Sequence, residues 1–366
     1  MTQRKVMKTI FSFITPTGLI TGWLFAQSGV AQVRIIPDDF SGARQPQIAM
    51  DASGHVFVAF GKDNSIYLAA SADGGKSFQP PTHVGTVEKL ALGMRRGPRI
   101  VAATDAVVIS AISHPDGNLY SWHSENGGRA WSEPARINEV ARSAREGLHA
   151  MAANEGGLLF MVWLDLRNQK TQLWGARSNN SGKSWEPNLK IYESPDGSIC
   201  ECCHPSVAVG DEGKIVVIWR NWLEGNRDMY QVRSEDGGKT FGQARKLGSG
   251  SWPLKGCPMD GGSLVISSNE VVSVWRRENR LFATAEGPRE TLVSDSGTQP
   301  IVIRTKTGPE FIWQNGGNLY RKSSGDGKAN LISRNASYAS AAWSPALRKS
   351  LIVWEGDGGI FCADPE

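Results

Sequence analysis

The octet SADGGKSF, at Ser71–Phe78, recurs three more times along the chain. SENGGRAW begins at Ser124, SNNSGKSW at Ser178 and SEDGGKTF at Ser234, so the intervals are 53, 54 and 56 residues. A nearly fixed period of this size indicates a repeat architecture. The Ser and Asp side chains can hydrogen-bond a tight turn, and the glycine at the fifth place can adopt a positive φ. The octets therefore predict recurring structural turns, each closed by an aromatic residue that tucks between neighbouring sheets.

Each octet follows three short apolar runs that are separated by turns. In the fourth unit these runs are Ser206–Val209, a run that ends at Trp219, and Met229–Arg233. A four-stranded antiparallel meander of this kind is the blade of a β-propeller. First strands of seven such units are expected near Pro46, Pro98, Leu148, Pro205, Pro258, Pro300 and Ser340. The sequence thus predicts an all-β, seven-bladed β-propeller, with a six-bladed ring as the alternative.

The seventh unit ends at Phe361, after only three strands. We expect Val33–Ile36 to supply its fourth strand, because pairing the two chain ends removes the last open sheet edges.

Most second strands end in an aromatic residue at the same register, as at Trp163 and Trp219. We expect these rings to pack between blades rather than to stack on a ligand.

The N-terminus has the pattern of an export signal. Its start is basic, no charged residue occurs between Lys8 and Arg34, and small residues lead up to Ala31. An uncleaved membrane anchor is the alternative, because the uncharged run is long enough to span a bilayer. We expect cleavage after Ala31, a periplasmic or extracellular location, and a single propeller domain over residues 32–366 with no further membrane span.

The formal net charge is +4, and three of the positive charges lie in the signal segment. The mature chain is therefore nearly neutral, which argues against a nucleic-acid partner, since such a partner calls for a basic face. We expect a monomer.

We expect a binding or catalytic site on the face of the disc opposite the octets. In a propeller, first strands start and second strands end on one face, whereas the octets join third and fourth strands on the other. Residues at those starts and ends include Arg44, Arg96, Glu146, Arg220, Arg276, Tyr338 and Glu355. Charged groups that gather at a concave mouth predict a ligand site. Strand-end arginines can equally be solvated or paired with carboxylates, and we expect Glu355 to pair with Arg44.

The octets resemble the Asp-box, or bacterial neuraminidase repeat, of the sialidase superfamily of β-propellers. That resemblance implies a carboxylate clamp of three arginines, Arg44, Arg220 and Arg276. It also implies Tyr338 as nucleophile, activated by Glu201 or Glu146, with Glu355 steadying Arg44 and Asp63 as the acid. The implied function is hydrolysis or binding of a glycan or another carboxylate-bearing ligand. A seventh blade departs from the six of the sialidases.

A second constellation consists of cysteines. Cys200, Cys202 and Cys203 form CECC before the first strand of unit four, and Cys257 occupies the matching place in unit five. A disulfide from Cys200 or Cys202 to Cys257 is one expectation. The other is a soft-metal site for copper, because thiolates near His204 and Met259 suit Cu(I).

The CECC…GCP pattern also resembles a subgroup of exported Asp-box proteins. The alternatives to a glycan-directed protein are therefore a copper-binding or thiol/disulfide protein, or a propeller with a purely structural or interaction role.

Overall fold

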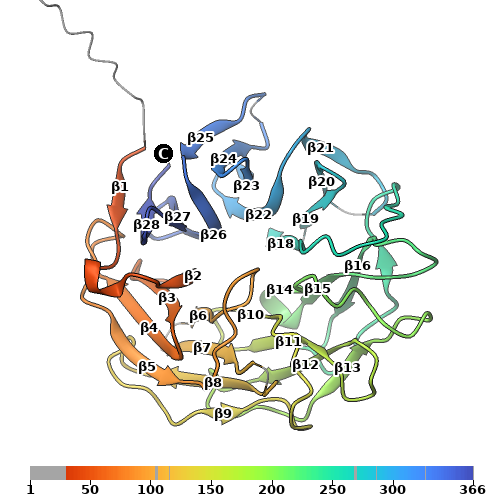
Figure 1. Cartoon of the computed structure of the whole chain (residues 1–366), viewed down its shortest axis with the longest axis horizontal. Helices are drawn as coiled ribbons and strands as arrows, with labels where there is room; N and C mark the ends of the chain where they lie inside the picture. Colours follow the sequence, from red (N-terminus) through yellow and green to blue (C-terminus); the bar gives the residue numbers. More distant parts are fainter. Residues whose placement is uncertain are drawn as a thin grey trace, which may run out of the picture.

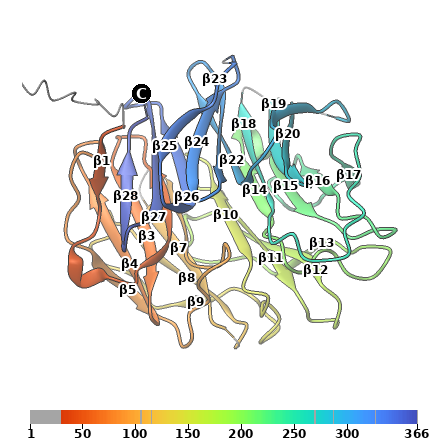
Figure 2. The same ribbon diagram turned by 45° about the horizontal axis from the view of Figure 1, so that its top comes forward.

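The chain forms a ring of seven four-stranded antiparallel sheets around a central axis (Figure 1). This computed structural model describes residues 30–365 except 104–105, 115, 268–269, 286 and 326, so the predicted signal segment lies almost entirely outside it. Seen obliquely, the sheets stand side by side like the blades of a propeller (Figure 2). The predicted seven-bladed β-propeller is confirmed.

Each of the first six blades consists of four strands that are consecutive in the chain. The strands of blades one to three are β2 (Arg44–Met50), β3 (Val56–Lys62), β4 (Ser65–Ser71), β5 (Thr82–Thr86), β6 (Arg99–Ala103), β7 (Ala106–Ile112), β8 (Leu119–Ser124), β9 (Ala135–Arg136), β10 (His149–Ala153), β11 (Leu159–Asp165), β12 (Gln172–Ser178) and β13 (Leu189–Tyr192). Those of blades four to six are β14 (Ser206–Val209), β15 (Ile215–Arg220), β16 (Met229–Ser234), β17 (Arg245–Lys246), β18 (Gly262–Ser267), β19 (Glu270–Arg277), β20 (Arg280–Thr284), β21 (Thr291–Ser294), β22 (Thr298–Thr305), β23 (Gly308–Asn315), β24 (Asn318–Ser323) and β25 (Asn330–Ser333). Two single-turn 3-10 segments, η1 (Asp38–Phe40) and η2 (Asp211–Gly213), are the helical elements of the described residues.

The seventh blade closes the ring with strands from both chain ends. It contains β26 (Ala336–Ser344), β27 (Lys349–Gly356) and β28 (Gly359–Ala363), and its outer strand is the N-terminal β1 (Gln32–Arg34). β1 runs antiparallel to β28, with Val33 opposite Cys362. The predicted closure is confirmed, because β1 covers the edge that β28 would otherwise expose.

One first strand starts later than predicted. In blade five β18 begins at Gly262 rather than near Pro258. Met259, just after Pro258, has a φ of +53°, which interrupts extended backbone. The segment before β18 is consequently a loop at the mouth of the ring.

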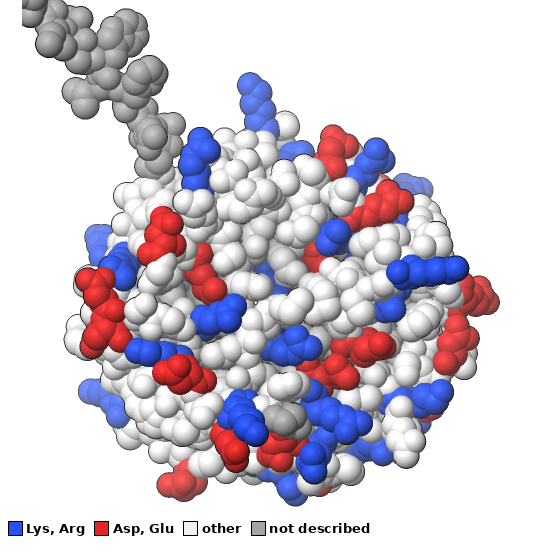
Figure 3. All heavy atoms as spheres, in the orientation of Figure 1, with Lys and Arg blue, Asp and Glu red and all other residues white. Residues whose placement is uncertain are grey.

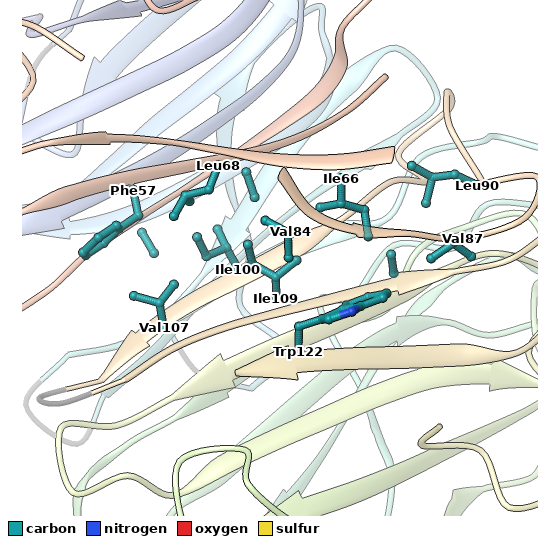
Figure 4. Close-up of a cluster of buried hydrophobic side chains, with 13 residues drawn as sticks. Phe57, Ile66, Leu68, Val84, Val87, Leu90, Ile100, Val107, Ile109 and Trp122 are labelled. Atoms are coloured by element: carbon teal, nitrogen blue, oxygen red, sulfur yellow. The ribbon is translucent and has the colours of Figure 1, made fainter. Parts of the chain in front are cut away.

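The core lies between neighbouring blades, as predicted for the second-strand aromatics. Trp163, Trp219 and Trp354 are fully buried. Figure 4 shows one such interface, where Leu68 of β4 and Trp122 of β8 belong to the same apolar cluster. Each blade buries both of its faces in this way, so the ring is stabilised as a whole.

The octets are structural turns that dock on the preceding blade. In the first octet the Ser71 hydroxyl oxygen accepts the Gly75 N–H at 2.9 Å, and Asp73 Oδ1 accepts the N–H groups of Lys76 and Ser77 at 2.9 and 3.0 Å. Gly75 has a φ of +86°, and a Cβ built on it would lie 2.8 Å from Leu351 of blade seven. This position therefore requires glycine for its backbone conformation and for its close packing.

Candidate functional site

Arg44 and Glu355 meet at the axial mouth, as the register predicts. Arg44 Nε lies 4.0 Å from Glu355 Oε2, and the Arg44 side chain is 48% exposed. Glu355 Oε1 also accepts the Gln45 N–H at 2.6 Å. Burial raises the pKa of Glu355, while Gln45 and Arg44 oppose that rise. Arg44 is thus a basic group that remains accessible to a ligand.

Arg96, Glu146 and Glu201 form a second group at this mouth. Arg96 Nε donates to the Glu146 carbonyl at 2.7 Å. Burial raises the pKa of the Glu146 carboxyl, the negative charge of Glu201 adds to the rise, and Arg96 opposes it. The two glutamates suggested as partners of Tyr338 therefore interact with each other.

Tyr338 lies in a bulge of β26, between Ser337 and Ser340, with a left-handed φ of +50°. Its phenol interacts electrostatically with the buried Arg95. Asp63 is exposed in the two-residue turn between β3 and β4. There its φ of +54° suits a hairpin turn, so the turn itself explains an aspartate at this position.

Two of the three arginines expected to form a clamp, Arg220 and Arg276, share Asp260 as a partner, whereas Arg44 pairs with Glu355. Arg220 is 1% exposed and donates to the carbonyls of Asp260, Arg227 and Arg276 at 3.1, 2.7 and 2.8 Å. Arg276 donates to the Glu278 carbonyl, and its Nη1 lies 3.7 Å from Asp260 Oδ2. The Arg220 guanidinium is therefore buried and hydrogen-bonded to three backbone carbonyls.

Three cysteine sulfurs form a compact buried cluster before β14. The Sγ atoms of Cys200 and Cys202 are 3.5 Å apart, as are those of Cys200 and Cys203, and Cys202 and Cys203 are separated by 3.9 Å. Arg227 Nη1 donates to Cys200 Sγ at 2.9 Å, and Met259 packs against the three side chains. Among the described residues this is the one group of His, Cys, Asp and Glu side chains whose ligand atoms are close enough to share a metal ion.

Two expectations about this cluster are wrong. The predicted disulfide is not formed: all five cysteines are free, and Cys257 is exposed while the CECC cysteines are buried. His204 does not join the sulfurs, because its ring lies against Gly261 and lines the central channel. Cys200 and Cys257 precede the first strands of adjacent blades, which is why they were expected to meet. The loop before β18 instead brings Met259 to the three sulfurs.

The cluster favours one thiolate and two thiols. Hydrogen bonds with Cys202 and Cys203, together with the charge of Arg227, hold the pKa of Cys200 well below its ordinary value, although burial opposes this. The same hydrogen bond with Cys200 raises the pKa of Cys202 to about 12. Burial, followed by the bonds with Cys200 and Cys202, raises the pKa of Cys203. Cys200 is thus the anionic centre, and Arg227 is its counter-charge.

Sequence reasoning missed Arg95, Asp260 and Arg227. Arg95 directly precedes the selected Arg96, and its Nη1 donates to the Ala339 carbonyl across the axis at 2.7 Å. Asp260 lies just after Met259 and is fully buried. No periodic signal marks these residues, because their partners are set by the loops between strands, as with Arg227 and Cys200, or lie in other blades, as with Arg95 and Ala339.

Charges of both signs are mixed on the face of the disc that Figure 3 shows. Figure 3 shows acidic and basic side chains interspersed around the centre of the face in view. No helix of the described residues is both long and apolar enough to traverse a bilayer.

No protein-family model matches this chain, and no curated protein does. Solved structures do match. A protein of unknown function from Dyadobacter fermentans has a TM-score of 0.54 at 17% identity, covering 92% of this chain and 98% of its own. An α-L-arabinanase from Penicillium chrysogenum, solved with arabinobiose, has a TM-score of 0.54 at 14% identity, covering 93% and 98%. The leech intramolecular trans-sialidase has a TM-score of 0.51 at 11% identity, covering 91% and 68%. At these identities the likeness shows a shared propeller fold.

Proposed function

We propose that this protein binds a soft metal ion, Cu(I), at the cluster of Cys200, Cys202 and Cys203. The observation that carries the proposal is the arrangement of the three sulfurs, which are buried and lie 3.5 to 3.9 Å apart beside a buried guanidinium. Sulfur ligands select Cu(I) over hard cations such as Mg²⁺ and Ca²⁺.

The spacing of the sulfurs fits a metal ion. A point equidistant from the three Sγ atoms lies about 2.1 Å from each of them, slightly less than the ~2.3 Å of a zinc–thiolate bond. Three thiolates at this spacing would hold such an ion, and a four-coordinate ion would take a fourth ligand. The thioether of Met259, which packs against the cluster, is the candidate for that ligand.

The surrounding charges also support metal binding. Three thiolates around a monovalent cation would carry two net negative charges. Arg227 is 4% exposed and donates to Cys200, and the charge of Arg220 acts on Cys203. These two positive charges would offset the negative charge of the loaded cluster, and a buried charge without such a partner is costly.

Titration of the reduced, full-length protein with Cu(I), in competition with a chromophoric Cu(I) chelator, tests the proposal. We expect one ion per chain, with affinity at least tenfold weaker in Cys200→Ser, Cys202→Ser and Cys203→Ser. Cys257→Ser, at an exposed cysteine, and Cys362→Ser, in a separate apolar cluster, are the matched controls and should bind normally.

The outcome that contradicts the proposal is equal binding by the cluster variants and the controls. Counting the free thiols of the denatured protein tests the alternative, a thiol/disulfide role for the CECC segment. Five free thiols are expected after metal removal, whereas three would indicate a disulfide and a thiol/disulfide role for the CECC segment.

A second candidate function is the binding of a glycan or another carboxylate-bearing ligand at the axial mouth. The half-exposed Arg44, positioned beside Glu355, favours it. The fold is shared with an arabinanase and a trans-sialidase, which gives that ligand class a precedent on this scaffold. Export through residues 1–31 would place the site where extracellular glycans occur.

A fluorogenic sialoside and a panel of acidic oligosaccharides test this second function. Turnover that disappears in Tyr338→Phe would support exo-sialidase chemistry, and binding without turnover that disappears in Arg44→Gln would support a lectin-like role. If the protein shows no turnover and no binding that depends on Arg44, both the enzymatic and the lectin-like versions are refuted.

A further inference from the structure

The central channel encloses a cavity that the functions above do not use. Its volume is about 260 Å³, many times the ~10–15 Å³ that one water molecule needs. Residues from the first strands of all seven blades line it, including Ile48, Ile100, Met151, Val207, Leu264, Ile301 and Ala341. The polar groups of the wall include two guanidinium groups, Arg95 and Arg99, and the ring of His204.

Arg99 is a buried charge without an acidic partner among its described contacts. It is 8% exposed, and its guanidinium donates to four carbonyls, those of His149, Gly97, Pro98 and Arg95. Carbonyl oxygens satisfy N–H groups but do not neutralise a whole charge.

Arg95 adds a second positive charge beside it. Arg95 donates to the side chain and the carbonyl of Gln299 and to the Ala339 carbonyl, so it crosses the top of the channel from blade two to blades six and seven. Desolvation lowers the pKa of both arginines, and the charge of Arg95 lowers that of Arg99 further. Asp260 and Glu355 attract Arg95 but are not among the groups that act on Arg99.

Two hydroxyl groups of the wall can also donate into the channel. Ser340 Oγ accepts the Ile48 N–H at 3.3 Å, and Ser263 Oγ accepts the Val302 N–H at 3.1 Å. Each hydroxyl therefore keeps its own proton for another acceptor. Both serines line the cavity, together with Arg95 and Arg99.

We propose that the channel binds one small oxyanion, a carboxylate or an inorganic oxyanion, held by Arg99 and Arg95. A charged group that donates to an anion forms stronger hydrogen bonds than one that donates to neutral acceptors. The anion neutralises the pair of arginines and accepts the remaining donors of the wall. This site is independent of the thiol cluster and distinct from Arg44 at the mouth.

Isothermal titration of the metal-free, full-length protein tests the proposal, with sodium sulfate, phosphate and acetate as probes and chloride keeping the ionic strength constant. We expect saturable 1:1 binding of at least one probe. Saturation by sulfate or phosphate alone would identify an inorganic oxyanion, and saturation by acetate alone a carboxylate. The absence of saturable binding for all three overturns the proposal.

Three variants locate the site. Arg99→Gln should weaken binding at least tenfold, whereas Arg129→Gln, at an exposed arginine of the second octet, should leave it unchanged. Loss of binding in Arg44→Gln, with unchanged binding in Arg99→Gln, would move the anion to the mouth and refute the channel site. If Arg99→Gln does not fold, Ser340→Ala replaces it, with a weaker affinity expected and unchanged affinity counting against the channel.

Discussion

Replacing Arg227 by methionine should raise the pKa of the Cys200 thiol. Methionine keeps an unbranched apolar stem but removes the charge and the hydrogen bond that Arg227 Nη1 donates to Cys200 Sγ at 2.9 Å. A hydrogen bond to a charged group contributes about 1.5–3 kcal/mol, which corresponds to about 1–2 pH units. We expect the titration of Cys200 to move upward by that amount, with the hydrogen bonds from Cys202 and Cys203 still holding it below an ordinary thiol.

The ultraviolet absorbance of the thiolate, followed against pH in the reduced and metal-free protein, measures this shift. Arg277→Met is the matched control. Arg227 lies over the ring of Trp222 and Arg277 over that of Phe282, but Arg277 pairs with Glu290 rather than with sulfur. Arg227 is also the hydrogen-bond partner of a proposed metal ligand, so Cu(I) affinity near neutral pH should fall about 10–100-fold in Arg227→Met. An unchanged thiolate titration would refute the assignment of Arg227 as the counter-charge.

Two further predictions concern the scaffold. Gly75→Ala should destabilise the protein in urea unfolding by about 1–3 kcal/mol more than Gly42→Ala. Both glycines have a φ near +87°, so the backbone strain of the two substitutions is the same. Only a Cβ at Gly75 meets a neighbouring side chain, that of Leu351. Equal losses would show that the octet does not pack tightly on blade seven. Asp165→Asn should cost about 3 kcal/mol at pH 7, because Asp165 is fully buried and accepts hydrogen bonds from Ser143, Trp163 and Arg167. Burial alone would raise the pKa of Asp165, but those hydrogen bonds lower it overall, so its contribution is present above the unfolded pKa of ~3.9 and disappears as the pH falls below it. The difference between wild type and variant in thermal unfolding should therefore shrink below about pH 4, and a constant difference would contradict the account.

The fold could be predicted from the sequence because its determinants are periodic and local. The octets carry their own turn chemistry, as the bonds of Ser71 and Asp73 show. The spacing of the apolar runs gave seven units, and the missing strand of the last unit pointed to the N-terminus. The start of β18 was misplaced because the left-handed backbone at Met259 has no sequence signature of the kind that glycine provides.

The site was predicted less well, because register locates a Cα atom but not the partners of a long side chain. Arg220 lies at the expected strand end, yet its guanidinium turns to the carbonyls of Asp260, Arg227 and Arg276. Arg95 acts through contacts with Ala339 and Gln299, more than 200 positions away in the chain. Contacts of this kind form only when the ring closes, so no local sequence pattern predicts them.

The most direct measurement of the central claim is X-ray absorption at the copper edge of the Cu(I)-loaded protein. The arrangement of Cys200, Cys202 and Cys203, with Met259 packed against them, predicts a first shell of three or four sulfur atoms and no nitrogen. The spectrum of Cys257→Ser should be identical to that of the wild type. An imidazole nitrogen in the first shell, or a linear site of two sulfurs, would contradict the three-thiol metal site.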